Sequence, residues 1–238
     1  MAHIIGVIQA RMSSSRFPKK MAAELIGYPI IDWVIRRTLI SKNIDKLFVA
    51  TSKNSENDFI VERANFYNVP IYRGSENNVL SRFESISKIE SPDLIIRICA
   101  DNPLISPIEI DRLIEFSLKN KPDYAFNHIP ALDNGYVDGS GTEAFTFNTL
   151  KRIVNNATSD EHKEHVTKYI WENINEFNVK YPIAPKELNF PNFSLDVDTI
   201  DDFERIKNLI SKISNWKYPE DIDLMYLPEW LNRLEKNA

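Results

Sequence analysis

Apolar residues follow two different rhythms along the first half of the chain. Short runs rich in Val, Ile and Leu, each as long as a buried strand, lie at 3–9, 46–52, 69–74 and 93–100. Longer segments, with an apolar residue every three to four positions as on one face of a helix, lie at 28–42, 55–67, 77–89 and 106–120. This alternation predicts an α/β fold with a mostly parallel, Rossmann-like sheet and helices on both faces.

Local sequence signals mark where two of these helices begin. Ser106 is expected to cap the helix that follows it, because Pro107 stands at the first helical position and Glu109 three residues after the cap. Ser55 and Asp58 have the same capping-box spacing and predict the start of the helix over 55–67.

The rhythm changes after about residue 122. Two short runs, at 123–129 and 142–148, predict the strands of a small β-rich insertion. The Asn-, Gly- and Asp-rich segment 130–141 between them is expected to be a mobile hairpin or lid. A helix is expected over 159–174, and a strand over 193–200 that leads into a further helix.

Composition and charge narrow the classes of function. The 238 residues suit one domain, and the net charge of −5 gives no electrostatic basis for binding nucleic acid or an anionic membrane in general. One cysteine, Cys99, excludes an intrachain disulfide and a multi-cysteine zinc site. No apolar stretch approaches the roughly 20 residues that span a bilayer, and no leader pattern opens the chain. A cytoplasmic protein is expected.

The first apolar run stops at Gln9 and continues into a basic loop, in the stretch IIGVIQARMSSSRFPKK at 4–20. In open α/β sheets, ligands bind beyond the carboxyl ends of the strands, and the N–H groups of a turn can hold an anion. Serine hydroxyls and the cations at 11, 16, 19 and 20 favour a triphosphate cradle here, with a solvated basic loop as the alternative. The stretch has neither the Walker A nor the G-x-G-x-x-G pattern.

Acidic residues stand at the ends of two expected strands. Asp101 follows the run LIIRICA, where a carboxylate could meet a metal–phosphate complex or simply form a turn. Asp196 and Asp198 are two apart, so in a strand both carboxylates would face the same side. A helix cap at Asp198 or Thr199 is the alternative.

Three further side chains have patterns that leave their roles open. Arg97 lies inside an apolar strand, where it is expected either to pair with a carboxylate or to point into the cleft. His162 and His165 could suggest a metal site, but a surface helix explains their spacing more simply.

Five motifs in order carry a resemblance to a known family. They are IIGVIQARMSSSRFPKK at 4–20, RGSENNVLSRF at 73–83, RICADNPLISPIEID at 97–111, EHVTKYIWEN at 164–173 and LDVDTIDDFERI at 195–206. Together they resemble the cytidylyltransferases related to CMP-KDO synthetase, in particular the SpsF-like branch named after a spore coat polysaccharide biosynthesis protein. The chain departs from that branch at Ser13 and Lys19, where glycine is usual.

The resemblance implies a fold like that of the nucleotide-diphospho-sugar transferases, and it implies site residues. The nucleotide-binding residues implied are Gln9, Ala10, Arg11, Ser14, Ser15, Arg16, Lys20, Thr51, Arg73, Ser75 and Arg82. The residues implied near the acceptor are Arg97, Glu143 and His165. Asp101 and Asp198 are implied to hold Mg²⁺, and Arg11, Lys20 and Asp101 are the expected catalytic residues. Asp196 stands where the branch more often has another residue, and it is expected as a helper at the metal site because of its spacing from Asp198.

The activity implied is transfer of CMP from CTP to a sugar acid or related small acceptor, with release of pyrophosphate, for a surface polysaccharide or glycan. A single nucleotidyltransferase domain is expected over 1–238, with a nucleotide-binding half at 1–122, an acceptor-binding half at 123–214 and a C-terminal wrap at 215–238. A GT-A-type glycosyltransferase and a non-catalytic nucleotide-binding protein are the alternatives. Relatives commonly dimerise, so a homodimer is an expected assembly.

Overall fold

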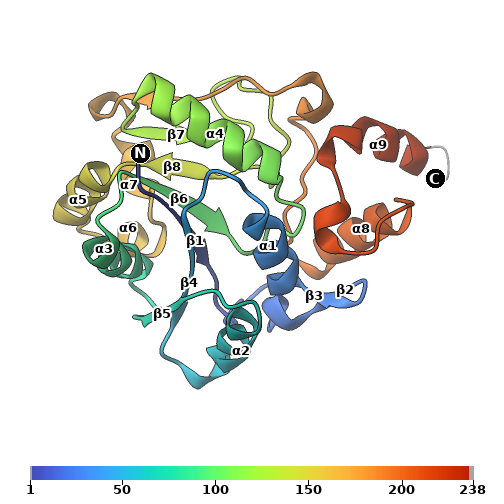
Figure 1. The fold of residues 1–238 in the computed structure, drawn as a ribbon, viewed down its shortest axis with the longest axis horizontal. Coiled ribbons are helices and arrows are strands. Elements are labelled where there is room, and N and C mark those ends of the chain that lie inside the picture. The colour runs from blue at the N-terminus through green and yellow to red at the C-terminus, as the bar shows by residue number, and fades with distance from the viewer. Residues whose placement is uncertain (1, 236–238) are drawn as a thin grey trace.

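The computed structural model describes residues 2–235, and its centre is a seven-stranded sheet with the strand order β5-β4-β1-β6-β8-β7-β9 (Figure 1). The strands are β1 (Ile4–Gln9), β4 (Lys46–Ser52), β5 (Ile71–Gly74), β6 (Leu94–Cys99), β7 (Tyr124–Phe126), β8 (Glu143–Phe145) and β9 (Val179–Lys180). Every neighbouring pair is parallel except those that involve β8, which runs antiparallel to β6 and to β7. A separate hairpin pairs β2 (Glu24–Leu25) with β3 (Tyr28–Pro29).

Helices cover both faces of the sheet, as the sequence pattern predicts (Figure 1). They are α1 (Ile30–Leu39), α2 (Asp58–Phe66), α3 (Val79–Glu90), α4 (Pro107–Asn120), α5 (Phe147–Asn156), α6 (Asp160–Glu164), α7 (Lys168–Glu172), α8 (Ile200–Ser211) and α9 (Leu227–Glu235). Among the described helices, none combines the length and the apolar character that crossing a membrane requires.

Alternate side chains of a strand enter different layers of the core, one on each face of the sheet. On β1, Ile4 and Ile8 belong to one buried cluster, which also takes in apolar residues of α1, α2 and α4. Ile5 and Val7 belong to a second cluster, with apolar residues of α3, α5 and α7. Because successive side chains of a strand point to opposite faces, one continuous apolar run fills both layers.

The cap expected at Ser106 is confirmed, because its Oγ accepts a hydrogen bond from the N–H of Glu109. The cap expected at Ser55 is wrong: 55–57 is a short 3₁₀ helix, and no side chain caps α2. The helix expected over 159–174 is two short helices, α6 and α7, separated by a break at 165–167.

The strand expected over 193–200 is also wrong, since only Ser194 forms an isolated bridge there. The reason is that its neighbours are loops rather than strands. The N–H of Leu195 donates to the carbonyl of Asp138, and that of Val197 donates to the carbonyl of Asp101. The segment is therefore extended, but it has no ladder beside it.

The Asn- and Gly-rich segment 130–141 is exposed only near its start, at residues 130, 132 and 133, and residues 134–141 are packed into the molecule. Tyr136 and Val137 are fully buried in the first cluster, and the Tyr136 hydroxyl donates to buried Glu109 at 2.7 Å. Buried polar contacts of this kind fix a loop in one arrangement.

Candidate active site

The site lies where β1 and β6 end side by side, because these parallel neighbours deliver the loops after Gln9 and Cys99 to the same edge of the sheet. A cavity of about 770 Å³ opens there. Its lining includes the predicted residues Gln9, Ala10, Arg11, Ser14, Ser15, Arg16, Lys20, Arg82, Arg97, Asp101, His165 and Asp198.

The loop after β1 is fixed at both ends and open in the middle. The N–H of Met12 donates to Asn57 Oδ1 at 2.8 Å, and the ring of Phe17 packs edge-on against Phe203. Between these anchors, the N–H groups of residues 13–16 have no hydrogen-bond partner within the described part of the chain. Consecutive unpaired N–H groups beside a cavity suit an anion.

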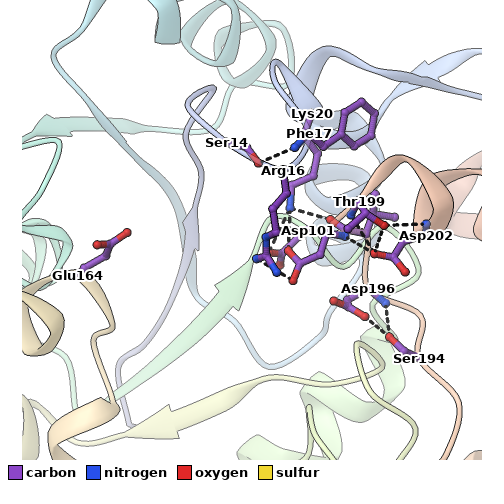
Figure 2. A network of polar contacts seen from close by, with 12 residues as sticks. Ser14, Arg16, Phe17, Lys20, Asp101, Glu164, Ser194, Asp196, Thr199 and Asp202 are labelled. Atoms are coloured by element: carbon purple, nitrogen blue, oxygen red, sulfur yellow. Dashed lines mark hydrogen bonds and ion pairs between the residues drawn. The ribbon is translucent and has the colours of Figure 1, made fainter.

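Lys20 brings the two predicted metal-site aspartates together (Figure 2). Its side chain is only 9% exposed, and its Nζ lies 3.5 Å from Asp101 Oδ2 and 3.3 Å from Asp198 Oδ1. The same ammonium group donates to the Val197 carbonyl at 2.6 Å. Lys20, Asp101 and Asp198 are far apart in the sequence, so only folding of the chain brings them into contact.

The two arginines of the loop also face carboxylates from other segments. Arg16 Nη2 lies 3.0 Å from Asp198 Oδ2, and Arg11 Nη2 donates to Glu164 Oε1 at 2.5 Å. Each of the three predicted phosphate-binding cations is thus already paired with an acid.

More carboxylates gather behind Asp101 and Asp198. Burial raises the pKa of Asp138 to about 6, and the negative charge of Asp196 adds to the effect. Burial and the charges of Asp198 and Asp101 likewise raise the pKa of Asp196, although its bond from the Ser194 hydroxyl opposes them. The nearby acids therefore disfavour the charged forms of Asp138 and Asp196.

This arrangement fits a divalent cation held by two carboxylates. Among the described residues, no group of three or more His, Cys, Asp and Glu side chains is arranged to hold a metal ion, so Asp196 does not complete a three-ligand set. Mg²⁺ needs only one or two carboxylates when phosphate oxygens and water supply the rest. The Lys20 ammonium between Asp101 and Asp198 shows that the position accepts a positive charge.

A buried ion pair supports the cavity floor beside Gln9. Arg97 on β6 is the register partner of Glu143 on β8, and its Nη1 donates to that carboxylate. The Tyr124 hydroxyl and the Thr167 hydroxyl each donate to Glu143 Oε1 at 2.6 Å. Burial opposes charge on Glu143, but Arg97 and these donors outweigh it and lower the pKa of Glu143 to about 2.

Cys99 lines the cavity too and is not simply a core residue. Burial raises the pKa of its thiol to about 12, although the charge of Arg97 opposes that effect. A thiol that stays protonated is a weak nucleophile, so the geometry does not suggest a covalent cysteine intermediate.

Arg82 is fully buried at the wall of the cavity. Its Nε donates to the Ser75 carbonyl and its Nη2 to the Glu76 carbonyl, while Nη1 has no partner among the described residues. Glu76 in turn accepts a hydrogen bond from the hydroxyl of Ser13 in the loop.

Five predicted site residues do not line the cavity. Arg73 pairs with Asp58 and donates to two carbonyls of the loop after β4. Ser75 accepts from the N–H of Asn78, and buried Thr51 lies in β4. Glu143 lies behind Arg97, and Asp196 bonds to Ser194. A direct ligand contact of these side chains is therefore not supported by their positions.

The two histidines of α6 and its C-cap have different surroundings. His162 is buried, and its Nε2 lies 2.6 Å from Glu172, so it does not face the cavity. His165 lines the cavity. The pair therefore does not form a metal site together.

Three carboxylates of this region were missed by the sequence interpretation: Glu76, Asp138 and Glu164. Glu164 belongs to the quoted stretch EHVT, and its position in that motif was the only available signal. Nothing in the loop sequence around Asp138 distinguishes it from an ordinary turn residue.

Comparison with known proteins gives one family. A family model described as cytidylyltransferase matches residues 5–227. An uncharacterized protein of Methanocaldococcus jannaschii is 40% identical over 201 residues, which cover 84% of this chain and 80% of that protein. The spore coat polysaccharide biosynthesis protein SpsF of Bacillus subtilis is 32% identical over 216 residues, 89% and 88% of the two chains.

A solved structure has the same overall fold. The structure of a cytidylyltransferase from Leptospira borgpetersenii serovar Hardjo-bovis matches with a TM-score of 0.87 at 26% identity. The match covers 100% of this chain and 95% of the other.

Proposed function

This chain belongs to the cytidylyltransferase family as a CTP-dependent nucleotidyltransferase, and we propose from that premise that it transfers CMP to a sugar acid or a related small acceptor. The product would be an activated building block for a surface polysaccharide or glycan. The similarity to SpsF, whose name assigns it to spore coat polysaccharide biosynthesis, supports that role.

The observation that carries the proposal is the position of Lys20 between Asp101 and Asp198, beside a loop with unpaired N–H groups. Phosphoryl-type transfer depends on positioning and charge neutralisation more than on covalent help from the protein. One edge of the sheet supplies cations, free donors and carboxylates within a single cavity.

In the proposed reaction, the triphosphate lies against residues 13–16 of the loop, with Arg11, Arg16 and Lys20 around it. A hydroxyl oxygen of the acceptor forms a bond to the α-phosphorus, the bond from that phosphorus to the β-phosphate oxygen breaks, and pyrophosphate leaves. The cations stabilise the negative charge that develops on the phosphate oxygens and the leaving group.

Asp101 and Asp198 would hold Mg²⁺, which we propose as the divalent metal of the reaction. The bound ion would neutralise phosphate charge. Asp138 and Asp196 lie behind these two carboxylates, and their negative charge strengthens the attraction for a cation at this point.

The acceptor is proposed to lie at the end of the cavity lined by Arg97, His165 and Gln9. Arg97 Nε donates a hydrogen bond to Gln9 and Nη1 donates to Glu143, whereas Nη2 has no hydrogen-bond partner within the described residues. A fixed guanidinium edge suits an acceptor carboxylate.

The proposal is tested by measuring pyrophosphate release with each of the four nucleoside triphosphates against a panel of sugar acids and phosphorylated small molecules. We expect release with CTP and an acidic sugar in the presence of Mg²⁺. Transfer from a nucleotide sugar without pyrophosphate would instead support a glycosyltransferase, and nucleotide binding without turnover across the panel would support a non-catalytic protein.

Lys20→Ala and Asp101→Asn should each lower CTP-dependent pyrophosphate release by at least about 100-fold. The first removes a cation that stabilises the reacting phosphates, and the second removes a carboxylate that would hold the metal ion. Lys119→Ala, an exposed lysine of α4, is the matched control and should keep full activity. Circular dichroism and a thermal melt check that the variants fold. Near-normal turnover in either folded variant would contradict the role given to that residue.

A further inference from the structure

Arg11 and Glu164 bridge the cavity from two distant parts of the chain. Arg11 follows β1, Glu164 ends α6, and their side chains are 37% and 39% exposed. Both line the cavity. Glu164 stands apart from the group formed by Lys20, Asp101 and Asp196 in the same view (Figure 2).

The fold holds Glu164 in this place. The three residues after it in the chain are anchored, because Val166 is fully buried and the Thr167 hydroxyl donates to buried Glu143. Before it, His162 pairs with Glu172 of α7. The backbone on both sides of Glu164 is therefore held in place, which keeps its carboxylate within reach of Arg11.

Glu164 differs from the other acids that pair with the loop. Asp101 and Asp198 face Lys20 at a position suited to a metal ion, so an arriving metal–nucleotide complex supplies them with a new cation. Glu164 shares no such group among the described residues. When a phosphate takes Arg11, Glu164 loses its partner and stands beside an added negative charge, which is unfavourable.

We propose that Glu164 is a counter-ion that competes with phosphate groups for Arg11 and so limits how tightly every phosphate ligand is held; this inference rests on the proposed function. Every phosphate ligand that reaches Arg11 must displace the same carboxylate. For a triphosphate with many other contacts, that displacement removes a small share of the binding free energy. For a weak anion such as pyrophosphate it removes a large share, so Glu164 disfavours occupation by small anions and helps pyrophosphate to leave.

The test uses the full chain and titrates inorganic pyrophosphate, CTP and cytidine by calorimetry. In Glu164→Gln, which keeps the size of the side chain and removes its charge, the Kd of pyrophosphate and of CTP should fall about 3- to 10-fold, the range of a partly exposed ion pair with added like-charge repulsion. Cytidine lacks phosphate, so its Kd should change less than about twofold. The inhibition constant of pyrophosphate should fall by the same factor as its Kd.

Glu161→Gln is the matched control, because it removes the same charge from the same short helix at a residue that pairs with Lys168 instead. It should leave all three affinities unchanged. Glu164→Gln should also have no effect on pyrophosphate binding when Arg11 is already changed to Ala, since the competition needs both side chains.

An unchanged or weaker affinity for pyrophosphate in Glu164→Gln, or an equal gain in the Arg11→Ala background, would overturn the inference. Failure of the proposed function looks different: wild-type protein would bind pyrophosphate and still not release it from CTP with any acceptor. Glu164→Ala, expected to change the Kd in the same direction as Glu164→Gln, keeps the test independent of any contact that the glutamine amide makes.

Discussion

At the scale of single residues, the opening loop contains two positions that usually hold glycine in the resembling branch. Lys19 has a φ of 59°, the left-handed region where a Cβ is unfavourable. Ser13 does not have a positive φ, and its hydroxyl donates to Glu76 at 2.5 Å. One departure from the branch therefore strains the backbone, and the other adds a contact.

These two positions predict stability changes of opposite sign. Lys19→Gly should raise the free energy of unfolding by about 0.5 kcal/mol, because relief of the left-handed strain exceeds the entropy that glycine adds to the unfolded chain. Ser13→Gly should lower it by about 1 kcal/mol through loss of the bond to Glu76. Urea denaturation of both variants measures the difference, and equal signs would contradict this account.

At the scale of elements, the short strand β8 carries the acid that holds Arg97. Glu143 stands opposite Arg97 in the register of β6 and β8, and Tyr124 from β7 donates to the same carboxylate. The pKa of Glu143, lowered to about 2, means that its ionised form stabilises the fold. That stability is present above the ordinary value near 4.5 and is lost as the pH falls towards 2.

Glu143→Gln should therefore lower the free energy of unfolding at pH 7 by about 3 kcal/mol, because Arg97 would keep a buried charge without its partner. The difference from wild type should shrink as the pH falls below about 4.5, where wild-type Glu143 begins to lose this contribution. Urea denaturation at pH 7 and pH 3 measures both effects. Exposed Glu229→Gln serves as control, and a difference independent of pH would argue against the ion pair as the cause.

At the scale of the whole molecule, the C-terminal segment is joined to the core by buried polar contacts as well as apolar ones. Arg37 of α1 is fully buried and donates to the carbonyls of Ile105, Pro219 and Ile222 at 2.6–2.8 Å. Trp230 of α9 is also buried in the first cluster. The described part of the segment expected as a C-terminal wrap is therefore packed against the core.

Arg37→Met should lower the free energy of unfolding by about 3 kcal/mol, because it removes the side-chain hydrogen bonds to three buried carbonyls. Since two of them lie at 219 and 222, the C-terminal segment should become sensitive to limited proteolysis before the rest of the chain. Lys119→Met, at an exposed cation of α4, is the control. Unchanged proteolysis of the segment would mean that apolar packing alone retains it.

The sequence by itself determined the layered α/β fold. The spacing of apolar residues that marks strands and helices is a local property, and it is clear in the first 120 residues. It also placed the basic loop and Asp101 at strand ends, and parallel strands carry their ends to one edge. Family motifs added Asp198, His165 and the nature of the reaction.

Only the tertiary structure decided which charges meet. The pairing of Lys20 with Asp101 and Asp198, of Arg11 with Glu164, and of Arg97 with Glu143 joins residues 46 to 178 positions apart. The tertiary structure also turned Arg73 away from the cavity and packed residues 134–141 of the expected lid into the molecule. It replaced the strand over 193–200 by an extended segment between loops. Such contacts depend on which loops the fold brings side by side, and no local pattern of residues carries that information.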